Sequence, residues 1–210
     1  MDIVNLFPTP IYTFKNLEFN NSELIDHCEK YADVLKHGEV ISSMRNLHDK
    51  EELKPLFSWF GKCLETIRVD CRYDCDRFEI TSSWFNKSMA NSGMKLNVHR
   101  HSMSFFSAVY YLTDGSPTVF EDPVIHRTQA QLEVLRELDI TTSPHQSIVA
   151  EPGKLIIFPS WLFHFSAPHI GENDRYIISF NTMPAGDVNY NIATDSVASI
   201  EILNKEKTRW

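Results

Sequence analysis

The segment 153–181 constrains the fold of this chain more than any other part of it. It contains two short apolar runs, 155–158 and 176–180, each with the length of a buried strand. His164 lies between the two runs, and Arg175 immediately precedes the second. Because burying an unpaired arginine is costly, Arg175 must either stay in water or bind an anion. The pattern fits a metal site beside a carboxylate-binding site, and it also fits a half-exposed histidine and a surface arginine.

Composition predicts a globular protein. The chain has 210 residues, of which 42% are hydrophobic and 12% aromatic, so we expect residues 1–210 to form a single domain. No apolar run approaches the roughly 18 residues of a membrane span, and the N-terminus does not resemble a secretion signal. We therefore expect a cytoplasmic protein, in which the four cysteines are reduced thiols.

The net charge is −8, and the sequence has no basic cluster. Binding to nucleic acid phosphates needs a positive surface, so we do not expect nucleic acid as the main partner. A small-molecule or peptidyl substrate is easier to reconcile with this charge. The sequence does not indicate an oligomeric state.

The first third of the chain predicts a helical support over about 20–70. Residues 6–14 are expected to be extended and to pair with a sheet. We expect a first helix over 20–38, capped by Ser22 and stopped by Gly38. A second helix should begin near Pro55, because apolar residues recur at helical spacing from Leu56 to Ile67.

From residue 78 the pattern changes to short strands, and we expect the barrel core at about 78–183. Tight turns between closely spaced strands are typical of an antiparallel sheet or barrel. In addition to the two runs above, the sequence predicts strands at 78–86, 95–99, 105–112 and 118–122, with turns at 91–93 and 114–117. Residues 126–140 look helical and are interpreted as an excursion between strands. The tail, around 197–202, is expected either to add an edge strand or to dock across the mouth of the barrel.

Two histidines, His99 and His101, end one of the predicted strands. Side chains two residues apart in a strand point to the same side, so both imidazoles should share a face. Together with His164 they make a set of three nitrogen donors suited to Fe(II), Zn or Ni, and Asp122 offers a carboxylate. A pair of exposed strand histidines is the simpler explanation of this motif alone. The other histidines of this half lie in loop-like stretches and are expected to be solvated: His126, His145 and His169.

Several short motifs follow one another along the chain. They are LFPTP (6–10), WFN (84–86), HRHSMSFFSAVYYL (99–112), FEDP (120–123), FPSWLFH (158–164) and RYIISFN (175–181). In this order they resemble the Fe(II)/2-oxoglutarate-dependent oxygenase superfamily, and more narrowly its small prolyl-hydroxylase-like branch. The resemblance implies a mainly β fold with supporting helices, namely a double-stranded β-helix or jelly-roll barrel. It also implies that the chain uses Fe(II), 2-oxoglutarate and O2.

The same resemblance implies roles for individual residues. His164 matches the distal metal ligand of the superfamily, and Arg175 matches the arginine that pairs with the far carboxylate of 2-oxoglutarate. Tyr111 falls where related enzymes place a tyrosine hydroxyl on that carboxylate, and Ser107 lies on the same strand face, so both are included in the expected co-substrate site. A core tyrosine whose hydroxyl is satisfied elsewhere is the alternative for Tyr111.

The chain departs from the superfamily at one motif. The usual proximal motif is His-x-Asp, whereas this chain has His99-x-His101. In one solution His101 replaces the aspartate, and the metal has three imidazole ligands. In the other, Asp122 supplies the carboxylate, and one of His99 and His101 is a ligand. The sequence leaves both solutions open.

We therefore expect oxidative decarboxylation of 2-oxoglutarate coupled to hydroxylation of a substrate that the sequence does not name. One alternative is a cofactor-independent three-histidine dioxygenase or isomerase of the cupin type, although Arg175 would then have no role. Another is a non-catalytic jelly-roll binding module. Trp84 and Trp161 look more like core residues than pocket walls. Substrate recognition is expected from the loops at 87–93 and 123–147 and from the tail after 184.

Overall fold

The computed structural model describes residues 7–32, 40–43, 45–124, 143–191 and 197–203. The elements in this part of the chain follow the order β1 (Tyr12–Lys15), α1 (Asn21–Glu29), β2 (Val40–Ser42), the 3-10 turns η1 (Leu47–Asp49) and η2 (Glu51–Leu53), α2 (Lys54–Asp70), β3 (Cys75–Ser88), β4 (Phe106–Tyr111), β5 (Gly115–Glu121), β6 (His145–Ala150), β7 (Lys154–Pro159), β8 (His164–Ser166), β9 (Arg175–Val188) and β10 (Ala198–Ile200).

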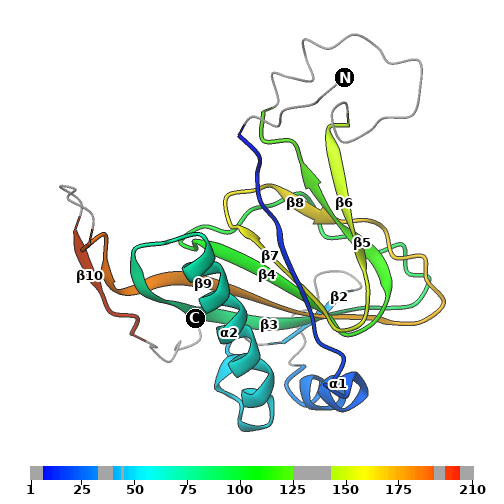
Figure 1. Cartoon of the computed structure of the whole chain (residues 1–210). Coiled ribbons are helices and arrows are strands. Elements are labelled where there is room, and N and C mark those ends of the chain that lie inside the picture. The colour runs from blue at the N-terminus through cyan, green and yellow to red at the C-terminus, as the bar shows by residue number, and fades with distance from the viewer. Residues whose placement is uncertain (1–6, 33–39, 44, 125–142, 192–196, 204–210) are drawn as a thin grey trace, which may run out of the picture.

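The strands form two antiparallel sheets (Figure 1). The larger sheet has the order β1-β7-β4-β9-β3-β2, and β10 pairs with the C-terminal end of β9. The smaller sheet has the order β6-β5-β8. The long strands β3 and β9 pair from Cys75 opposite Val188 to Ser88 opposite Arg175, with two register shifts on the way. Arg175 is therefore held at the start of a long central strand of the larger sheet.

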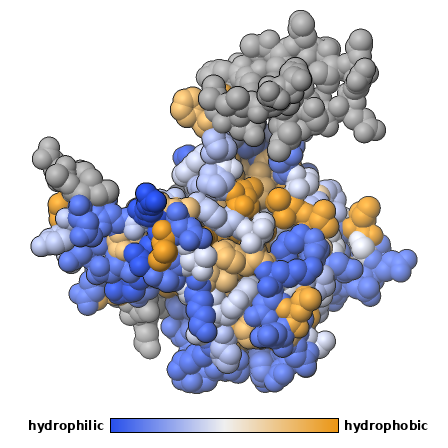
Figure 2. Space-filling model, viewed as in Figure 1, coloured by the Kyte–Doolittle hydropathy of each residue, from blue (hydrophilic) through white to orange (hydrophobic). Residues whose placement is uncertain are grey.

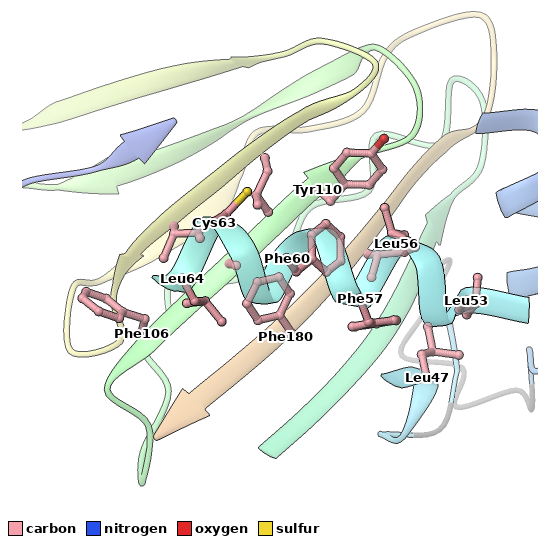
Figure 3. Packing of buried hydrophobic residues seen from close by; sticks show 14 of the residues in the cluster. Leu47, Leu53, Leu56, Phe57, Phe60, Cys63, Leu64, Phe106, Tyr110 and Phe180 are labelled. Atoms are coloured by element: carbon pink, nitrogen blue, oxygen red, sulfur yellow. The ribbon is translucent and has the colours of Figure 1, made fainter. Parts of the chain in front are cut away.

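Side chains alternate between the two faces of the larger sheet and build two separate cores. One face packs against the helices, where the ring of Phe60 in α2 lies 5.4 Å from that of Tyr110 and 4.9 Å from that of Phe180 (Figure 3). The opposite face packs against the smaller sheet in a second cluster: Val109, Tyr111, Phe120, Ala150, Ile156, Phe158, Leu162 and Ile177. The barrel interior is thus the space between the two sheets.

Both expected helices are present. Helix α2 has Pro55 in its first turn, where a missing N–H breaks no helical bond, and its apolar spacing buries one face as predicted. Helix α1 is shorter than the expected 20–38, because it ends at Glu29. Its N-cap is Asn20 and not Ser22. The Asn20 side chain accepts a hydrogen bond from the backbone of Glu23. The expected stop at Gly38 lies outside the described residues.

Most of the expected strands are present, and the N-terminal and C-terminal segments pair with the sheet as β1 and β10. The strand predicted at 95–99 is wrong, because only His99 forms a bridge, to His164 in the short strand β8. Strand β5 begins at Gly115 and not at 118. A register shift between Gly115 and Thr118 accommodates Pro117, which has no N–H for the ladder.

Strands β2 and β6 were not predicted. Strand β6 begins at His145, which the sequence placed in a loop, and its polar sequence HQSIVA leaves mostly exposed side chains without a regular apolar face. The helix-like pattern at 126–140, with His126, lies outside the described residues.

None of the helices in the described ranges is long and apolar enough to cross a membrane. On the side of the molecule in Figure 2, hydrophilic residues dominate and hydrophobic residues form scattered groups between them. All four cysteines are free thiols, and only Cys71 is exposed.

Candidate metal centre and anion pocket

Three histidines from two segments of the chain come together in the structure. His99 and His101 precede β4, and His164 begins β8. Their candidate ligand atoms all lie within 4.8 Å of one another. The ring centroids of His99 and His164 are 4.4 Å apart, and that of His101 lies 5.2 Å from each of them. These are the three histidines that the sequence singled out.

The strand predicted at 95–99 is absent, and individual backbone hydrogen bonds position the three histidines instead. The N–H of His99 donates to the carbonyl of His164 at 3.0 Å, and the N–H of His164 donates back at 2.9 Å. The N–H of His101 donates to the carbonyl of Ser160 at 3.0 Å. Both segments are therefore aligned by main-chain bonds that do not depend on the imidazole rings.

Two of the imidazoles are oriented by the backbone. Nδ1 of His99 lies 2.6 Å from the carbonyl oxygen of Asn97, and Nδ1 of His164 lies 3.0 Å from that of Leu162. A carbonyl only accepts hydrogen bonds, so each Nδ1 carries the proton and donates. The lone pair of each ring is then on Nε2. Fixing the tautomer in this way is typical of metal-binding histidines.

The environment keeps the rings of His101 and His164 neutral. Burial, with further contributions from the neighbouring His164, His99 and Arg45, lowers the pKa of His101 to about 3. Burial also lowers the pKa of His164 to about 4, with a smaller contribution from His99. Neutral imidazole is the form that binds metal, and three such nitrogens suit Fe(II), Zn(II) or Ni(II).

Asp122 is not part of this cluster. It follows β5, and its Oδ1 accepts a hydrogen bond from the backbone of Val124 at 2.9 Å. The β5 residue opposite His164 is Phe120, whose ring centroid lies 6.0 Å from that of His164. Among the described residues, the geometry therefore assembles the three-imidazole set and not the set with Asp122.

The histidines line a pocket between the two sheets, with a volume of about 440 Å³ that includes its open mouth. Its walls are largely apolar, with side chains such as Val109, Phe158 and Ile177. The polar side chains of Thr118 and Ser179 and the guanidinium-bearing Arg175 also line it. None of the described residues that line the pocket is acidic.

Arg175 is 2% exposed, and Nε donates to the backbone carbonyl of Ser116 at 2.9 Å. Within the described ranges no carboxylate pairs with its guanidinium, and its terminal nitrogens have no hydrogen-bond partner. Burial lowers the pKa of this arginine, although a guanidinium remains charged at any physiological pH. An unpaired buried cation in a pocket is a binding site for an anion.

Gly115 makes room for Arg175. Its φ is +132°, and a Cβ at this position would lie 3.2 Å from Cγ and Cδ of Arg175 and 3.0 Å from Cε1 of His169. His169 is 1% exposed, so the expectation that it is solvated is wrong. Backbone hydrogen bonds join His169 to Gly93 and Met94, so the loop that contains these two residues packs against the loop of His169. The local sequence around His169 does not reveal this contact, because the two loops are far apart in the chain. Its Nε2 donates to the carbonyl of Asn173 at 2.8 Å.

Tyr111 and Ser107 are buried, and neither is among the residues that line the pocket. The hydroxyl of Tyr111 donates to Oγ1 of Thr118 at 2.6 Å. The hydroxyl of Ser107 lies 2.8 Å from Oγ of Ser160 and donates to Oδ1 of Asn181 at 2.8 Å. Thr118 thus lies between Tyr111 and the pocket, a position that no sequence motif indicated.

The two tryptophans differ in position. Trp84 is 7% exposed and lines the pocket, so it is both a core residue and a wall of the site. Trp161 is half exposed and is not among the residues that line the pocket.

Residues 82–181 match the family model described as "Putative 2OG-Fe(II) oxygenase". This range contains the three histidines and Arg175. No curated protein matches the chain.

Several solved structures are similar in fold. The non-heme alpha ketoglutarate-dependent carbocyclase SnoK from nogalamycin biosynthesis is 13% identical, with a TM-score of 0.64 over 94% of this chain and 90% of that chain. A Pseudomonas putida prolyl-4-hydroxylase is 12% identical, with a TM-score of 0.59 over 85% and 94%. HygX from Streptomyces hygroscopicus, solved with nickel, 2-oxoglutarate and hygromycin B, is 13% identical, with a TM-score of 0.53 over 84% and 83%. These likenesses confirm the double-stranded β-helix that the resemblance of the sequence implies.

Proposed function

We propose that the chain is a member of the Fe(II)/2-oxoglutarate-dependent oxygenase superfamily, which the match of residues 82–181 to the family model supports. In this proposal it is a dioxygenase in which His99, His101 and His164 hold the iron and Arg175 holds the co-substrate. One observation carries the proposal. A three-imidazole cluster and a buried arginine that pairs with none of the described carboxylates line the same pocket of a jelly-roll barrel. We further propose that residues 1–210 form one oxygenase domain.

The donor set fits Fe(II). Nδ1 of His99 and of His164 is used by a backbone carbonyl, which leaves Nε2 of each ring for the metal. The low pKa of His101 and of His164 keeps both rings unprotonated, so binding does not require the loss of a proton near neutral pH. With three neutral ligands, the site adds no negative charge to the metal.

Arg175 fits the far carboxylate of 2-oxoglutarate. A guanidinium binds a carboxylate through two parallel hydrogen bonds, and the terminal nitrogens of Arg175 are available for them among the described residues. The bond from Nε to Ser116 and the absence of a side chain at Gly115 hold the guanidinium in the pocket. Thr118 Oγ1 accepts the hydrogen bond from the Tyr111 hydroxyl, so the hydroxyl of Thr118 is free to donate its own hydrogen bond to the same carboxylate.

Bound together, iron and 2-oxoglutarate supply the oxidative decarboxylation of 2-oxoglutarate that is coupled to hydroxylation of the substrate. The apolar walls of the pocket, among them Val109, Phe158 and Ile177, exclude water from the reacting centre. We propose that the substrate is a small molecule or a peptidyl group. The proposed location is the cytoplasm, where the four free thiols would stay reduced.

Anaerobic titration of 2-oxoglutarate into the Fe(II)-loaded protein tests this function. The wild type should develop a visible metal-to-ligand charge-transfer band. Arg175→Gln should bind 2-oxoglutarate more weakly by about 2–5 kcal/mol, or roughly 30- to 5000-fold, because it removes one partner of a buried charge pair. The matched control is Arg77→Gln, which changes an exposed arginine paired with Glu79 and should leave the band unchanged.

A second function is favoured by one observation, namely that the described metal cluster contains no carboxylate. A cofactor-independent dioxygenase or isomerase of the cupin type uses such a three-histidine centre. If iron binds but 2-oxoglutarate produces no band, this second function replaces the first. If no metal binds, the fold serves as a binding module.

A further inference from the structure

Arg45 lies beside the metal pocket on a loop that is anchored to β3. The loop connects β2 to η1, and the backbone carbonyl of Arg45 accepts a hydrogen bond from Ser83 at 3.0 Å. The next residue, Asn46, forms a parallel bridge with Ser83. The guanidinium carbon of Arg45 lies 4.2 Å from the centre of the Trp84 ring, which is a cation–π distance.

Trp84 is a wall of the pocket, so the position of Arg45 bears directly on the site. The Trp84 ring centroid lies 5.6 Å from that of His101. With the Asn86 amide oriented to satisfy its neighbours, its oxygen accepts the indole N–H of Trp84 at 3.2 Å, and its nitrogen donates to Ser42 at 3.0 Å. The Trp84 indole, over which Arg45 lies, is therefore held by Asn86, which is itself held by Ser42.

Arg45 has no counter-ion among the described residues. Of the carboxylates in the described ranges, none forms an ion pair or a hydrogen bond with its guanidinium. Partial burial lowers the pKa of Arg45, and its charge contributes to the low pKa of His101. A cation close to a cation-binding centre is unfavourable by itself, since like charges repel. The arrangement becomes favourable when an anion lies between or beside them.

The charges of the site call for more than one anion. The chain as a whole carries −8, yet the pocket has no acidic lining residue among those described. A bound dication would be balanced by the two carboxylates of 2-oxoglutarate. The charges of Arg175 and Arg45 would remain in excess. Arg175 is deep in the pocket, whereas Arg45 as a residue is exposed, so an incoming molecule can approach it.

We propose that Arg45, seated on Trp84, recognises an anionic group, a carboxylate or a phosphate, on the primary substrate. This inference rests on the proposed function, because it assigns the substrate class of that same site. Arg45 is then a substrate-binding residue. Lysine at this position should bind the anionic group more weakly, since a lysine does not present a planar donor fork.

The test uses benzoate and its neutral isostere benzamide on the protein loaded anaerobically with Fe(II) and 2-oxoglutarate. The co-substrate then occupies the Arg175 site. The readout is the indole N–H resonance of Trp84 in nitrogen-15 NMR spectra, assigned with Trp84→Phe. Benzoate should shift this resonance in a saturable way, and benzamide should bind at least roughly tenfold more weakly, a difference that corresponds to one lost charge-assisted interaction.

Two variants and one control complete the test. Arg45→Gln should weaken benzoate binding to the level of benzamide, and Arg45→Lys should be intermediate. The control is Arg100→Gln, because Arg100 also sits over an aromatic ring, 5.3 Å from the centre of Phe163, and its loss should not change benzoate binding. In Arg45→Gln the charge-transfer band with 2-oxoglutarate should be as strong as in the wild type.

The outcomes separate this inference from the proposed function. The anion site is contradicted if benzoate and benzamide bind alike, if benzoate produces no shift, or if Arg45→Gln binds benzoate as the wild type does. It is also contradicted if Arg45→Gln weakens the charge-transfer band, since Arg45 would then belong to the co-substrate site. An Arg45-dependent benzoate shift without any band would retain the anion site and remove the oxygenase.

Discussion

His99 and His164 exchange both backbone hydrogen bonds across an isolated antiparallel bridge, and their ring centroids lie 4.4 Å apart. The bridge joins a segment without regular structure to the three-residue strand β8. Each ring also donates from Nδ1 to a carbonyl two residues before it in the chain. Two distant segments are therefore aligned by their main chains, and both Nε2 atoms are available to one metal ion.

The third ligand can be identified by exchanging residues. His101→Ala should lower Fe(II) affinity by more than the roughly 10–100-fold that the loss of an outer-shell partner costs. His101→Asp should retain iron, because it creates the two-histidine-one-carboxylate set that non-haem Fe(II) enzymes use. Asp122→Asn is the matched control and should bind iron as the wild type does. Metal content after dialysis against a chelator measures all three, and loss of iron in Asp122→Asn would favour the carboxylate set.

Thr118 should matter more than Tyr111 for binding of 2-oxoglutarate. Thr118 lines the pocket, whereas the Tyr111 hydroxyl is used by the 2.6 Å bond to Thr118, and the Tyr111 ring, 5.8 Å from the guanidinium carbon of Arg175, is kept by a change to Phe. Thr118→Val should weaken 2-oxoglutarate binding by about 1.5–3 kcal/mol, the usual range for a hydrogen bond to a charged group. Tyr111→Phe should mainly lower the free energy of unfolding. Titration of 2-oxoglutarate and urea unfolding of both variants measure this, and a greater loss of affinity in Tyr111→Phe would restore the direct tyrosine contact implied by the sequence.

Gly115→Ala should destabilise the protein and weaken binding of 2-oxoglutarate. The new methyl group would contact Arg175 and His169 at 3.0–3.2 Å, in a backbone conformation with a positive φ that alanine adopts poorly. We expect a loss of about 1–3 kcal/mol in the free energy of unfolding. Gly61→Ala is the matched control, because Gly61 lies in α2 with nothing within 4 Å of its Cβ position. It should stabilise the protein by about 0.5–1 kcal/mol, and equal effects of the two changes would contradict this account.

The metal-free protein should become less stable as the pH falls from about 6.5 towards 4. Burial lowers the pKa of His101 to about 3 and that of His164 to about 4, whereas histidines in an unfolded chain titrate near 6.5. In this window the unfolded state binds more protons than the folded state. The free energy of unfolding therefore falls by up to about 1.4 kcal/mol per pH unit for each histidine, and neither histidine contributes to the pH dependence above about pH 7.

Urea unfolding at a series of pH values measures this dependence. The lowered pKa of a carboxyl such as Glu151, about 2, acts only at lower pH, because an unfolded glutamate titrates near 4.3. His101→Asn should flatten the slope between pH 6.5 and 4.5. An unchanged slope in this variant would show that the buried histidines do not cause it.

The supporting elements follow from local sequence. The apolar spacing of α2 and the alternation along β3 and β9 are properties of neighbouring residues, and each matches one face of a helix or strand. Helix α1 and strand β5 differ from expectation at their ends, where the side chain of Asn20 and the register shift near Pro117 set the boundary. Strand β6 has no apolar alternation to reveal it, and its pairing with β5 depends on a distant segment.

By itself, the sequence determined which residues carry the chemistry. The three histidines and Arg175 were identifiable because their residue types and order match the requirements of a metal and a carboxylate. Only the tertiary structure decided which of them meet. It brought His101 and not Asp122 to the cluster, buried His169, placed Thr118 between Tyr111 and the pocket, and set Arg45 on Trp84. The physical reason is that these contacts join segments far apart in the chain, and their geometry is set by strand register and loop packing.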